Sequence, residues 1–238
     1  MSLNETLGIN MTKESVEEMR EWMRNYINHT CVYRARNKSE WIPGKIKDTQ
    51  YIWQFYLRRA LANDQFCKYV GITFWEMCGA DFKKRQFQIA GLEWASTPLL
   101  CAIGTQAKKF GIHCNTLSIR ANRKSYGFKN RFEGIIDYNL PVLVIDDLCN
   151  SKNTLIRARQ YCLDEGLDIY DYGFAIINKD LDGSHVDHDK YIGEDFKFKT
   201  IFNLQDLDMR WEEYFPLHGE NQLVPFVPER ALTPTKAG

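Results

Sequence analysis

The sequence has no apolar run of the length that a membrane-spanning helix requires, which is roughly 18–20 residues. Its seven cysteines show no CxxC spacing, so a zinc site built on paired cysteines is not indicated. The 31 basic and 31 acidic residues cancel, and no overall field would attract nucleic acid or an anionic membrane. These absences favour a cytoplasmic protein with reduced thiols, and we expect neither a nucleic-acid partner nor a membrane partner.

The composition is that of an ordinary globular protein, with 44% hydrophobic and 26% charged residues in a chain of 238. Such a chain can bury one sizeable core. Short apolar runs alternate with single helical patterns from about residue 87 to residue 177, which predicts an α/β fold with an open parallel sheet flanked by helices. We expect three regions: a small N-terminal hood region with helices (1–80), an α/β core (81–180), and a C-terminal extension that packs on the core (181–238).

Periodicity and turn residues predict the individual elements. Helices are expected over 12–28, 66–78, 99–110 and 154–165, and strands over 87–90, 115–119, 142–146 and 169–177. Residues 51–61 are dense in aromatics and could begin as a strand and end as a helix. The stretch 219–238 carries prolines and few apolar anchors, so we expect it to wrap the surface or fray. The acidic loop 181–189 contains two histidines, but its acids lack a metal-ligand spacing and a solvated loop is the favoured interpretation.

One stretch combines a buried strand with two adjacent acids. The apolar run 142–145 leads directly into Asp146 and Asp147, and Thr154 opens the next helical pattern. Ligands of open parallel sheets bind beyond the carboxyl ends of the strands, and the following helix start is an anion site. This arrangement suits a ligand with hydroxyls and phosphate, such as a phosphorylated sugar. The alternative is that the two acids merely cap the next helix.

Residues 141–154, PVLVIDDLCNSKNT, resemble the phosphoribosyl-diphosphate (PRPP) binding motif of the type I phosphoribosyltransferases. Three further segments resemble other motifs of that family, in the same chain order. GLEWASTPLL (91–100) is similar to the diphosphate loop, IRANRKSYG (119–127) to the mobile basic loop of the orotate phosphoribosyltransferase-like branch, and YIWQFYLRR (51–59), loosely, to that branch's aromatic base-binding strand. We therefore expect the type I phosphoribosyltransferase fold.

The resemblance implies a role for each matched segment. Catalytic roles fall to Asp146, Asp147, Lys124 and Arg120, with the two acids holding the ribose hydroxyls directly or through water on a metal. The other implied site residues are Asn150, Ser151, Lys152, Asn153 and Thr154 (PRPP phosphate loop), Glu93, Trp94, Ala95 and Ser96 (diphosphate loop), Arg123, Tyr126 and Gly127 (mobile loop), and Lys179, Phe55 and Tyr56 (acceptor binding). No direct protein ligand to a metal is expected, because Mg²⁺ would be held mainly by the substrate and by water near the acid pair.

The implied activity is transfer of ribose 5-phosphate from PRPP to a nucleobase-like acceptor, with release of diphosphate, in a Mg²⁺-dependent homodimer of nucleotide metabolism. The phosphate loop, however, lacks the glycine of the family pattern and contains Lys152, and Ala121 stands where the orotate branch has a lysine. The alternative function is therefore a regulatory protein of the same fold that binds PRPP or a nucleotide without turnover. A third, less favoured interpretation treats the basic segment 120–131 as a solvated face or a nucleic-acid patch.

Overall fold

The structure is a computed structural model that describes residues 13–35, 37–43, 49–51, 53–121, 130–149, 152–179, 197–207 and 217–218. Its centre is a six-stranded sheet in the order β10-β9-β8-β5-β6-β7. The strands are β5 (Gln88–Leu92), β6 (Thr116–Ile119), β7 (Phe132–Glu133), β8 (Val142–Cys149), β9 (Gly173–Asn178) and β10 (Phe198–Asn203). All neighbours pair in parallel except β6 and β7, so the sheet is parallel with one antiparallel edge strand.

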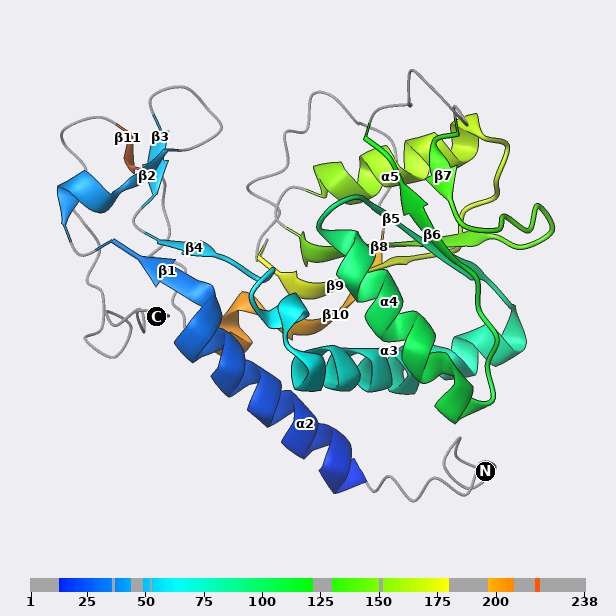
Figure 1. Cartoon of the computed structure of the whole chain (residues 1–238), viewed down its shortest axis with the longest axis horizontal. Coiled ribbons are helices and arrows are strands. Elements are labelled where there is room, and N and C mark those ends of the chain that lie inside the picture. The colour runs from blue at the N-terminus through cyan, green and yellow to red at the C-terminus, as the bar shows by residue number, and fades with distance from the viewer. Residues whose placement is uncertain are drawn as a thin grey trace.

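Four α-helices accompany the sheet: α2 (Lys13–Tyr26), α3 (Asp64–Lys84), α4 (Ser96–Ala107) and α5 (Asn153–Asp164). A π-helical segment, Ile27–Cys31, continues α2, and 3₁₀ turns cover Lys38–Glu40, Ala60–Ala62, Lys108–Phe110 and Leu204–Leu207. Figure 1 shows α3 and α4 on one face of the sheet and α5 on the other. No helix in the described ranges is both long and apolar enough to cross a membrane.

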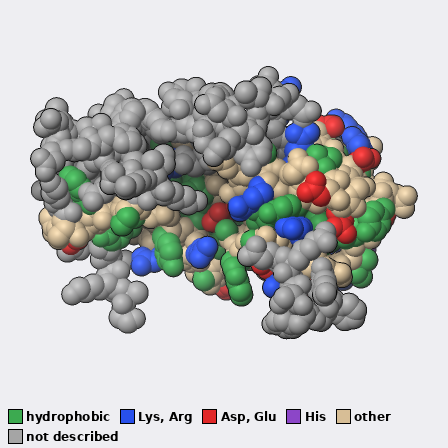
Figure 2. Space-filling model, turned by 90° about the horizontal axis from the view of Figure 1, so that it is seen from above, with side chains coloured by type: hydrophobic (Ala, Val, Ile, Leu, Met, Phe, Trp, Pro, Cys, Tyr) green, Lys and Arg blue, Asp and Glu red, His purple; other side chains and the backbone are tan. Residues whose placement is uncertain are grey.

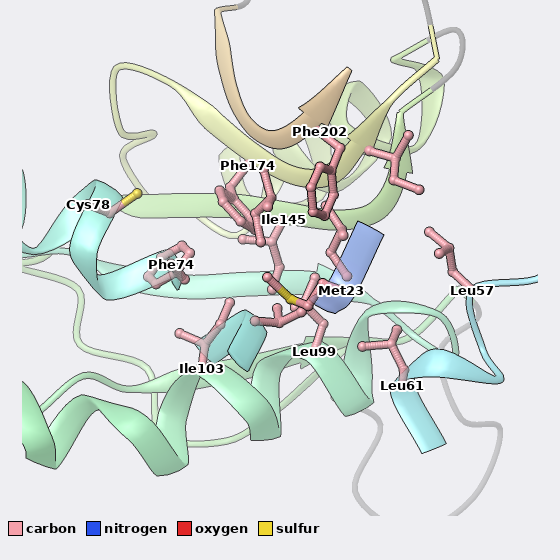
Figure 3. Close-up of a cluster of buried hydrophobic side chains, with 14 of the residues drawn as sticks. Met23, Leu57, Leu61, Phe74, Cys78, Leu99, Ile103, Ile145, Phe174 and Phe202 are labelled. Carbon is pink, nitrogen blue, oxygen red and sulfur yellow. The ribbon is translucent and has the colours of Figure 1, made fainter. Parts of the chain in front are cut away.

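Alternate residues of the central strands point to opposite faces, as the period of a strand requires. Leu143 and Ile145 of β8 belong to the cluster that includes α3 and α4, whereas Val142 and Val144 belong to the cluster with α5. Figure 3 shows the larger cluster, in which Phe74 of α3 meets Phe174 of β9 with ring centroids 4.9 Å apart. Because helices cover both faces of the sheet, the central strands consist of continuous apolar residues. These apolar runs are the pattern that predicts the strands from sequence.

Two small sheets form the region before α3. Strand β1 (Val32–Arg34) pairs with β4 (Trp53–Phe55), and β2 (Ile42–Pro43) pairs with β3 (Thr49–Tyr51), which also pairs with β11 (Leu217–His218). We call these five strands the hood. Trp53 and Phe55 of β4 are buried in the same cluster as α3 and α4, so this part of the hood is anchored on the core. Figure 1 shows the hood beside one end of the central sheet.

The predicted fold class is confirmed, and each of the four expected strands and helices of the α/β core is present with bounds shifted by a few residues. Helix α4 and the 3₁₀ turn after it end at Gly111 (φ 66°), and α5 ends before Gly166 (φ 80°), as expected for left-handed residues after a helix. Strands β1, β2, β3, β7, β10 and β11 were not predicted, whereas β4 lies where residues 51–61 were expected to begin as a strand. The unpredicted strands are short or mostly polar, and β10 lies in the C-terminal region, where no strand was expected. Residues 181–189 and 219–238 lie outside the described residues.

Helices α3 and α4 lie close together at Gly71. A Cβ atom built on Gly71 would lie 2.3 Å from the backbone oxygen of Ala102, a distance at which one helix must move. Gly104 of α4 is a useful contrast, because its Cβ atom would lie 3.3 Å from the Cγ2 methyl of Thr116, a side-chain atom that can yield. Gly71 therefore sets the separation of the two helices that cover this face.

We predict that Gly71→Ala lowers the free energy of unfolding by about 1–3 kcal/mol, because overpacking outweighs the gain in helix propensity. Gly104→Ala is the matched control, since it adds the same methyl group to the neighbouring helix, and it should stay within about 1 kcal/mol of wild type. Urea unfolding followed by circular dichroism measures both. Equal effects of the two substitutions would contradict the close approach at Gly71.

Candidate active site

The chain order predicts a crevice beyond the carboxyl ends of the central strands β5 and β8. From β5 the chain passes through α4 to β6 on one side of the sheet, and from β8 it passes through α5 to β9 on the other. Helices α4 and α5 cover opposite faces (Figure 1). In open α/β sheets, ligands bind beyond the carboxyl ends of the strands at such a switch point. The segments that follow β5 and β8 are therefore the first place to look for chemistry.

The turn after β5 folds back tightly against the end of β8. A Cβ atom on Gly91 would lie 2.3 Å from Ser96 Cβ and 3.0 Å from the oxygen of Ile145, so only glycine fits there. The buried Ser96 hydroxyl donates to that Ile145 oxygen over 3.3 Å. Glu93 is fixed by its backbone N–H, which donates to Ile119 O over 2.8 Å, and Trp94 is 80% exposed. The Glu93–Trp94 peptide bond is cis. The predicted diphosphate loop, Glu93 to Ser96, thus lines one side of the crevice.

The acid pair lies on the other side of the crevice, within β8. Asp146 is only 4% exposed, and its Oδ1 accepts the backbone N–H of Asp147 over 3.0 Å. Asp147 is half-buried, and its Oδ1 accepts the N–H of Leu148 over 2.9 Å. The strand is longer than predicted, because it continues to Cys149 and pairs Leu148 with Ile177 of β9. The two acids are therefore held by the sheet itself, not by a loop.

Burial raises the pKa of both carboxyl groups, and the negative charge of Asp147 raises the pKa of Asp146 further. A side-chain hydrogen bond from Thr154 to Asp146 acts in the opposite direction. At Asp147 the positive charge of Arg58, from the turn after β4, also lowers the pKa. Two adjacent acids kept from water favour a cationic or hydrogen-bond-donating ligand, which relieves their mutual repulsion.

The residue before α5 has a left-handed backbone conformation, which glycine adopts most easily, although this residue is a lysine. Lys152 precedes the helix with φ 56° and ψ −7°, in the left-handed region. This conformation costs a lysine about 1–2 kcal/mol, and it lies at the position where the family pattern has glycine. The Lys152 ammonium is 5.4 Å from the ring centre of Phe198. Asn153 and Thr154 form the first turn of α5, and Asn150 and Ser151 lie outside the described residues.

Only the two ends of the basic segment are described. Arg120 follows β6, and its backbone N–H donates to Arg131 O over 2.8 Å, which closes the base of the segment. The Arg120 guanidinium lies 3.2 Å from Glu133 and 3.8 Å from Glu93. The implied residues Arg123, Lys124, Tyr126 and Gly127 lie outside the described residues, so their roles stay predictions.

The predicted acceptor residues separate into two groups. Lys179 follows β9, its backbone N–H donates to Cys149 O over 2.7 Å, and its ammonium is 4.3 Å from the Trp53 ring centre. Burial lowers the pKa of Lys179 to about 8. Phe55 is buried in the core beside Trp53, whereas Tyr56 is 52% exposed and lies 5.4 Å from the Arg59 guanidinium. The structure thus brings Lys179 to the hood, where it meets Trp53 and not Phe55.

Two charged residues of this region were missed by sequence reasoning. Arg58 influences the pKa of Asp147, and Glu133 of β7 binds Arg120. The Arg58-Arg59 pair directly after an aromatic strand was a usable signal for the first. Nothing in the local sequence marks Glu133, because its partner is reached only through the antiparallel pairing of β7 with β6.

We predict that Asp146→Asn stabilises the metal-free protein at high pH. Because the raised pKa keeps the folded carboxyl protonated at pH values where the unfolded one is ionised, wild-type stability falls as pH rises above about 4. Asparagine keeps an oxygen for the Asp147 N–H without the charge. The substitution should therefore raise the free energy of unfolding by at least about 1 kcal/mol at pH 9, and by less than about half that at pH 5. Urea unfolding in EDTA checks this, with exposed Asp168→Asn as control; a pH-independent effect would contradict it.

Comparison with known proteins gives a sequence relative and a set of structural neighbours. No protein-family model matches the chain. Over 149 residues the chain is 26% identical to an orotate phosphoribosyltransferase of Methanocaldococcus jannaschii, covering 63% of this chain and 78% of that protein. The matched portion is therefore more than half of the chain, at an identity that leaves substrate preference open.

Solved structures of orotate phosphoribosyltransferase from Mycobacterium tuberculosis share the fold. The complex with Fe(III) dicitrate superposes with a TM-score of 0.63 at 16% identity, covering 80% of this chain and 99% of that one. The complex with PRPP superposes with a TM-score of 0.59 at 17% identity, covering 80% and 99%. The chain therefore has the fold of the type I phosphoribosyltransferases, and its sequence is similar to that of an orotate phosphoribosyltransferase.

Proposed function

We propose that the chain transfers ribose 5-phosphate from PRPP to a nucleobase-like acceptor and releases diphosphate. The observation that carries this proposal is the Asp146–Asp147 pair at the switch point, with Asp146 buried and Asp147 half-buried, followed by a left-handed residue at the start of α5. An acid pair for ribose hydroxyls beside a helix start for a phosphate matches a phosphorylated sugar in both respects. The M. tuberculosis neighbour solved with PRPP supports the same donor.

In the proposed reaction, Asp146 and Asp147 hold the ribose hydroxyls and stabilise positive charge that develops on the sugar as diphosphate leaves. Thr154 is hydrogen-bonded to Asp146, so the acid pair and the phosphate-binding helix start are positioned by one contact. The backbone N–H groups of the first turn of α5 would bind the 5-phosphate. Residues Glu93 to Ser96 form the wall against which the diphosphate lies.

The donor set fits Mg²⁺ that is held largely by substrate and water. Carboxylate oxygens are suitable ligands, but the described residues contain no group of three or more acidic, histidine or cysteine side chains that could enclose an ion. Asp146 and Asp147 would hold the ion through the water bound to it. Bound there with the substrate, Mg²⁺ would neutralise the departing diphosphate.

The acceptor site is proposed between Lys179 and the hood. Trp53 lies beside the Lys179 ammonium, and the exposed ring of Tyr56 is available for a planar base. Lysine offers one point charge where arginine would offer a bidentate fork, so a carboxylate on the base would be held less firmly. We therefore propose a nucleobase-like acceptor without assigning orotate.

The basic segment is proposed to close over the diphosphate and exclude water, with Lys124 and its neighbours supplying positive charge. The resemblance to the family implies that this segment reaches a second subunit, and we propose a homodimer. A nucleic-acid role is less well supported. Figure 2 shows basic and acidic side chains interspersed over the described part of one face, whereas a nucleic-acid site would present a continuous basic stripe there.

A regulatory protein that binds PRPP without turnover is the second candidate. The observation that favours it is Lys152, whose backbone is strained and whose ammonium lies near Phe198. A strained phosphate loop would bind its ligand less firmly than the glycine loop of the family pattern. Saturable PRPP binding, with no diphosphate released across a panel of bases and no reverse reaction with nucleotides, would favour this candidate over the enzyme.

We predict that the wild type binds PRPP in the presence of Mg²⁺ and that the double variant Asp146→Asn, Asp147→Asn loses at least about 30-fold in affinity, about 2 kcal/mol. Isothermal titration calorimetry measures binding, and diphosphate release with a panel of bases measures turnover. Asp168→Asn, an exposed acid before β9, should bind as wild type does. Absence of PRPP binding by the folded wild type at millimolar ligand would refute the proposed function.

We predict that Lys152→Gly leaves PRPP affinity within about threefold of wild type while it stabilises the protein by up to about 1 kcal/mol. Glycine adopts φ 56° without strain, and the ammonium near Phe198 is not needed to bind phosphate. Lys152→Ala is the matched control, because it removes the ammonium but keeps the strain, so it should be less stable than Lys152→Gly. A tenfold loss of PRPP affinity in both variants would instead make Lys152 a phosphate ligand.

A further inference from the structure

Arg120 lies between two carboxylates at the edge of the proposed diphosphate site. Its Nη1 donates to Glu133 Oε1 over 3.2 Å and lies 3.8 Å from Glu93 Oε2. Glu133 comes from the edge strand β7, and Glu93 comes from the turn after β5. The three backbones are fixed relative to one another, because Glu93 N–H donates to Ile119 O and β6 pairs with β7. Arg120 therefore has one close partner and one more distant partner.

The two acids differ in their surroundings. The Glu93 side chain is 21% exposed, whereas that of Glu133 is 52% exposed, and Arg120 itself is 27% exposed. Water and salt screen a charge less where it is shielded, so Glu93 acts more strongly on a ligand in the crevice. The group of three carries a net negative charge, and Asp146 and Asp147 add to it. An anionic diphosphate that enters this site would therefore meet an arginine, Arg120, that already contacts Glu93 and Glu133.

The Arg120 guanidinium is not saturated by these contacts. Its Nε–H is buried and has no hydrogen-bond partner within the described residues. A buried donor without an acceptor is unfavourable. Because the Nε–H has no partner in the described part of the chain and the Glu93 contact is long, the Arg120 guanidinium can donate to a different oxygen.

We propose that Glu93 is an internal competitor of diphosphate for Arg120, and thereby the residue that sets how firmly the protein holds that group. The inference rests on the proposed function. In the free protein Glu93 shares the guanidinium with Glu133; when the donor binds, a diphosphate oxygen takes the place of Glu93, while the shorter contact to Glu133 keeps Arg120 oriented. Glu93 is thus a specificity-determining residue, and Glu133 is a positioning residue. Release of the diphosphate product is assisted because Glu93 returns to Arg120.

The test measures the affinities of three ligands, each with Mg²⁺, by isothermal titration calorimetry: inorganic diphosphate, PRPP and ribose 5-phosphate. Glu93→Gln should bind diphosphate and PRPP about 3- to 10-fold more tightly than wild type, because the competitor has lost its charge. Its affinity for ribose 5-phosphate, which has no diphosphate, should stay within about twofold. Glu133→Gln, the matched loss of one charge on the other side of Arg120, should bind diphosphate no more tightly than wild type.

A double-mutant cycle locates the effect at Arg120. In an Arg120→Gln background, Glu93→Gln should produce no gain in diphosphate affinity, because the contested group is absent. Glu93→Ala removes the same charge and should reproduce the gain, which covers the case in which the glutamine variant is poorly folded. Thermal unfolding of each variant is recorded alongside.

Three outcomes would overturn the inference. Unchanged or weaker diphosphate and PRPP binding by both Glu93 variants would make Glu93 a structural ion-pair partner only. An equal gain for ribose 5-phosphate would indicate a general field effect in place of competition at Arg120. If wild type binds none of the three ligands, the proposed function fails together with this inference, whereas PRPP binding that is insensitive to Glu93 refutes the inference alone.

Discussion

The parallel pairing of β5 with β8 is the constraint on which the site depends. These two strands are adjacent in the sheet although α4, β6 and β7 lie between them in the chain. Because the chain leaves them toward opposite sides, a ligand-binding crevice is expected at their carboxyl ends. Gly91 of β5 has no side chain, so Ser96 can approach β8 and donate a hydrogen bond to the Ile145 oxygen. The acids of β8 and the turn after β5 are neighbours for this reason.

The site combines strong local negative charge with a proposed anionic substrate. Asp146 is buried and Asp147 is half-buried, their burial raises the free-energy cost of ionising the pair, and Glu93 adds a third acid after β5. Arg58 lowers the pKa of Asp147, whereas three other cationic side chains contact different groups: Arg120 contacts glutamates, Lys152 lies near Phe198 and Lys179 lies beside Trp53. If the proposed function holds, the donor would be bound through its sugar hydroxyls and a metal more than through direct contacts with cationic side chains.

Much of the core could be predicted from local sequence because its strands are buried on both faces and its helices end at glycine. The run 142–145 and the helix before Gly166 are examples in which composition and position agree. Strand β10 could not be found in this way, since Lys199 and Thr200 interrupt its apolar pattern and its place is set by pairing with β9. Lys199 is accommodated because its ammonium binds Asp81 of α3 over 2.6 Å, a partner far away in sequence.

The sequence predicts the acid pair and the phosphate loop. It does not predict the backbone conformation of Lys152 or the charged side chains that contact the site. The loop has no glycine to mark a left-handed residue, and the structure puts Lys152 in that conformation. The ion pairs of Arg120 depend on two other strands, and the influence of Arg58 on Asp147 depends on how the hood is anchored. A motif indicates which ligand groups a segment can contact. The charged side chains that surround the segment come from distant parts of the sequence, so only the tertiary structure shows them.

The pairing of β3 with β11 affects the order in which parts of the protein fold during synthesis. Residues 49–51 are made early, but one of their two partner strands is 217–218, near the other end of the chain. Contacts of such long sequence separation form late, because the intervening chain must be ordered first. During synthesis, the central sheet can therefore assemble while the hood still has an open strand edge, and an unpaired edge invites association with other chains. Among the described residues, the hood is thus completed only when 217–218 has been made, whereas the central sheet needs no residue beyond Asn203.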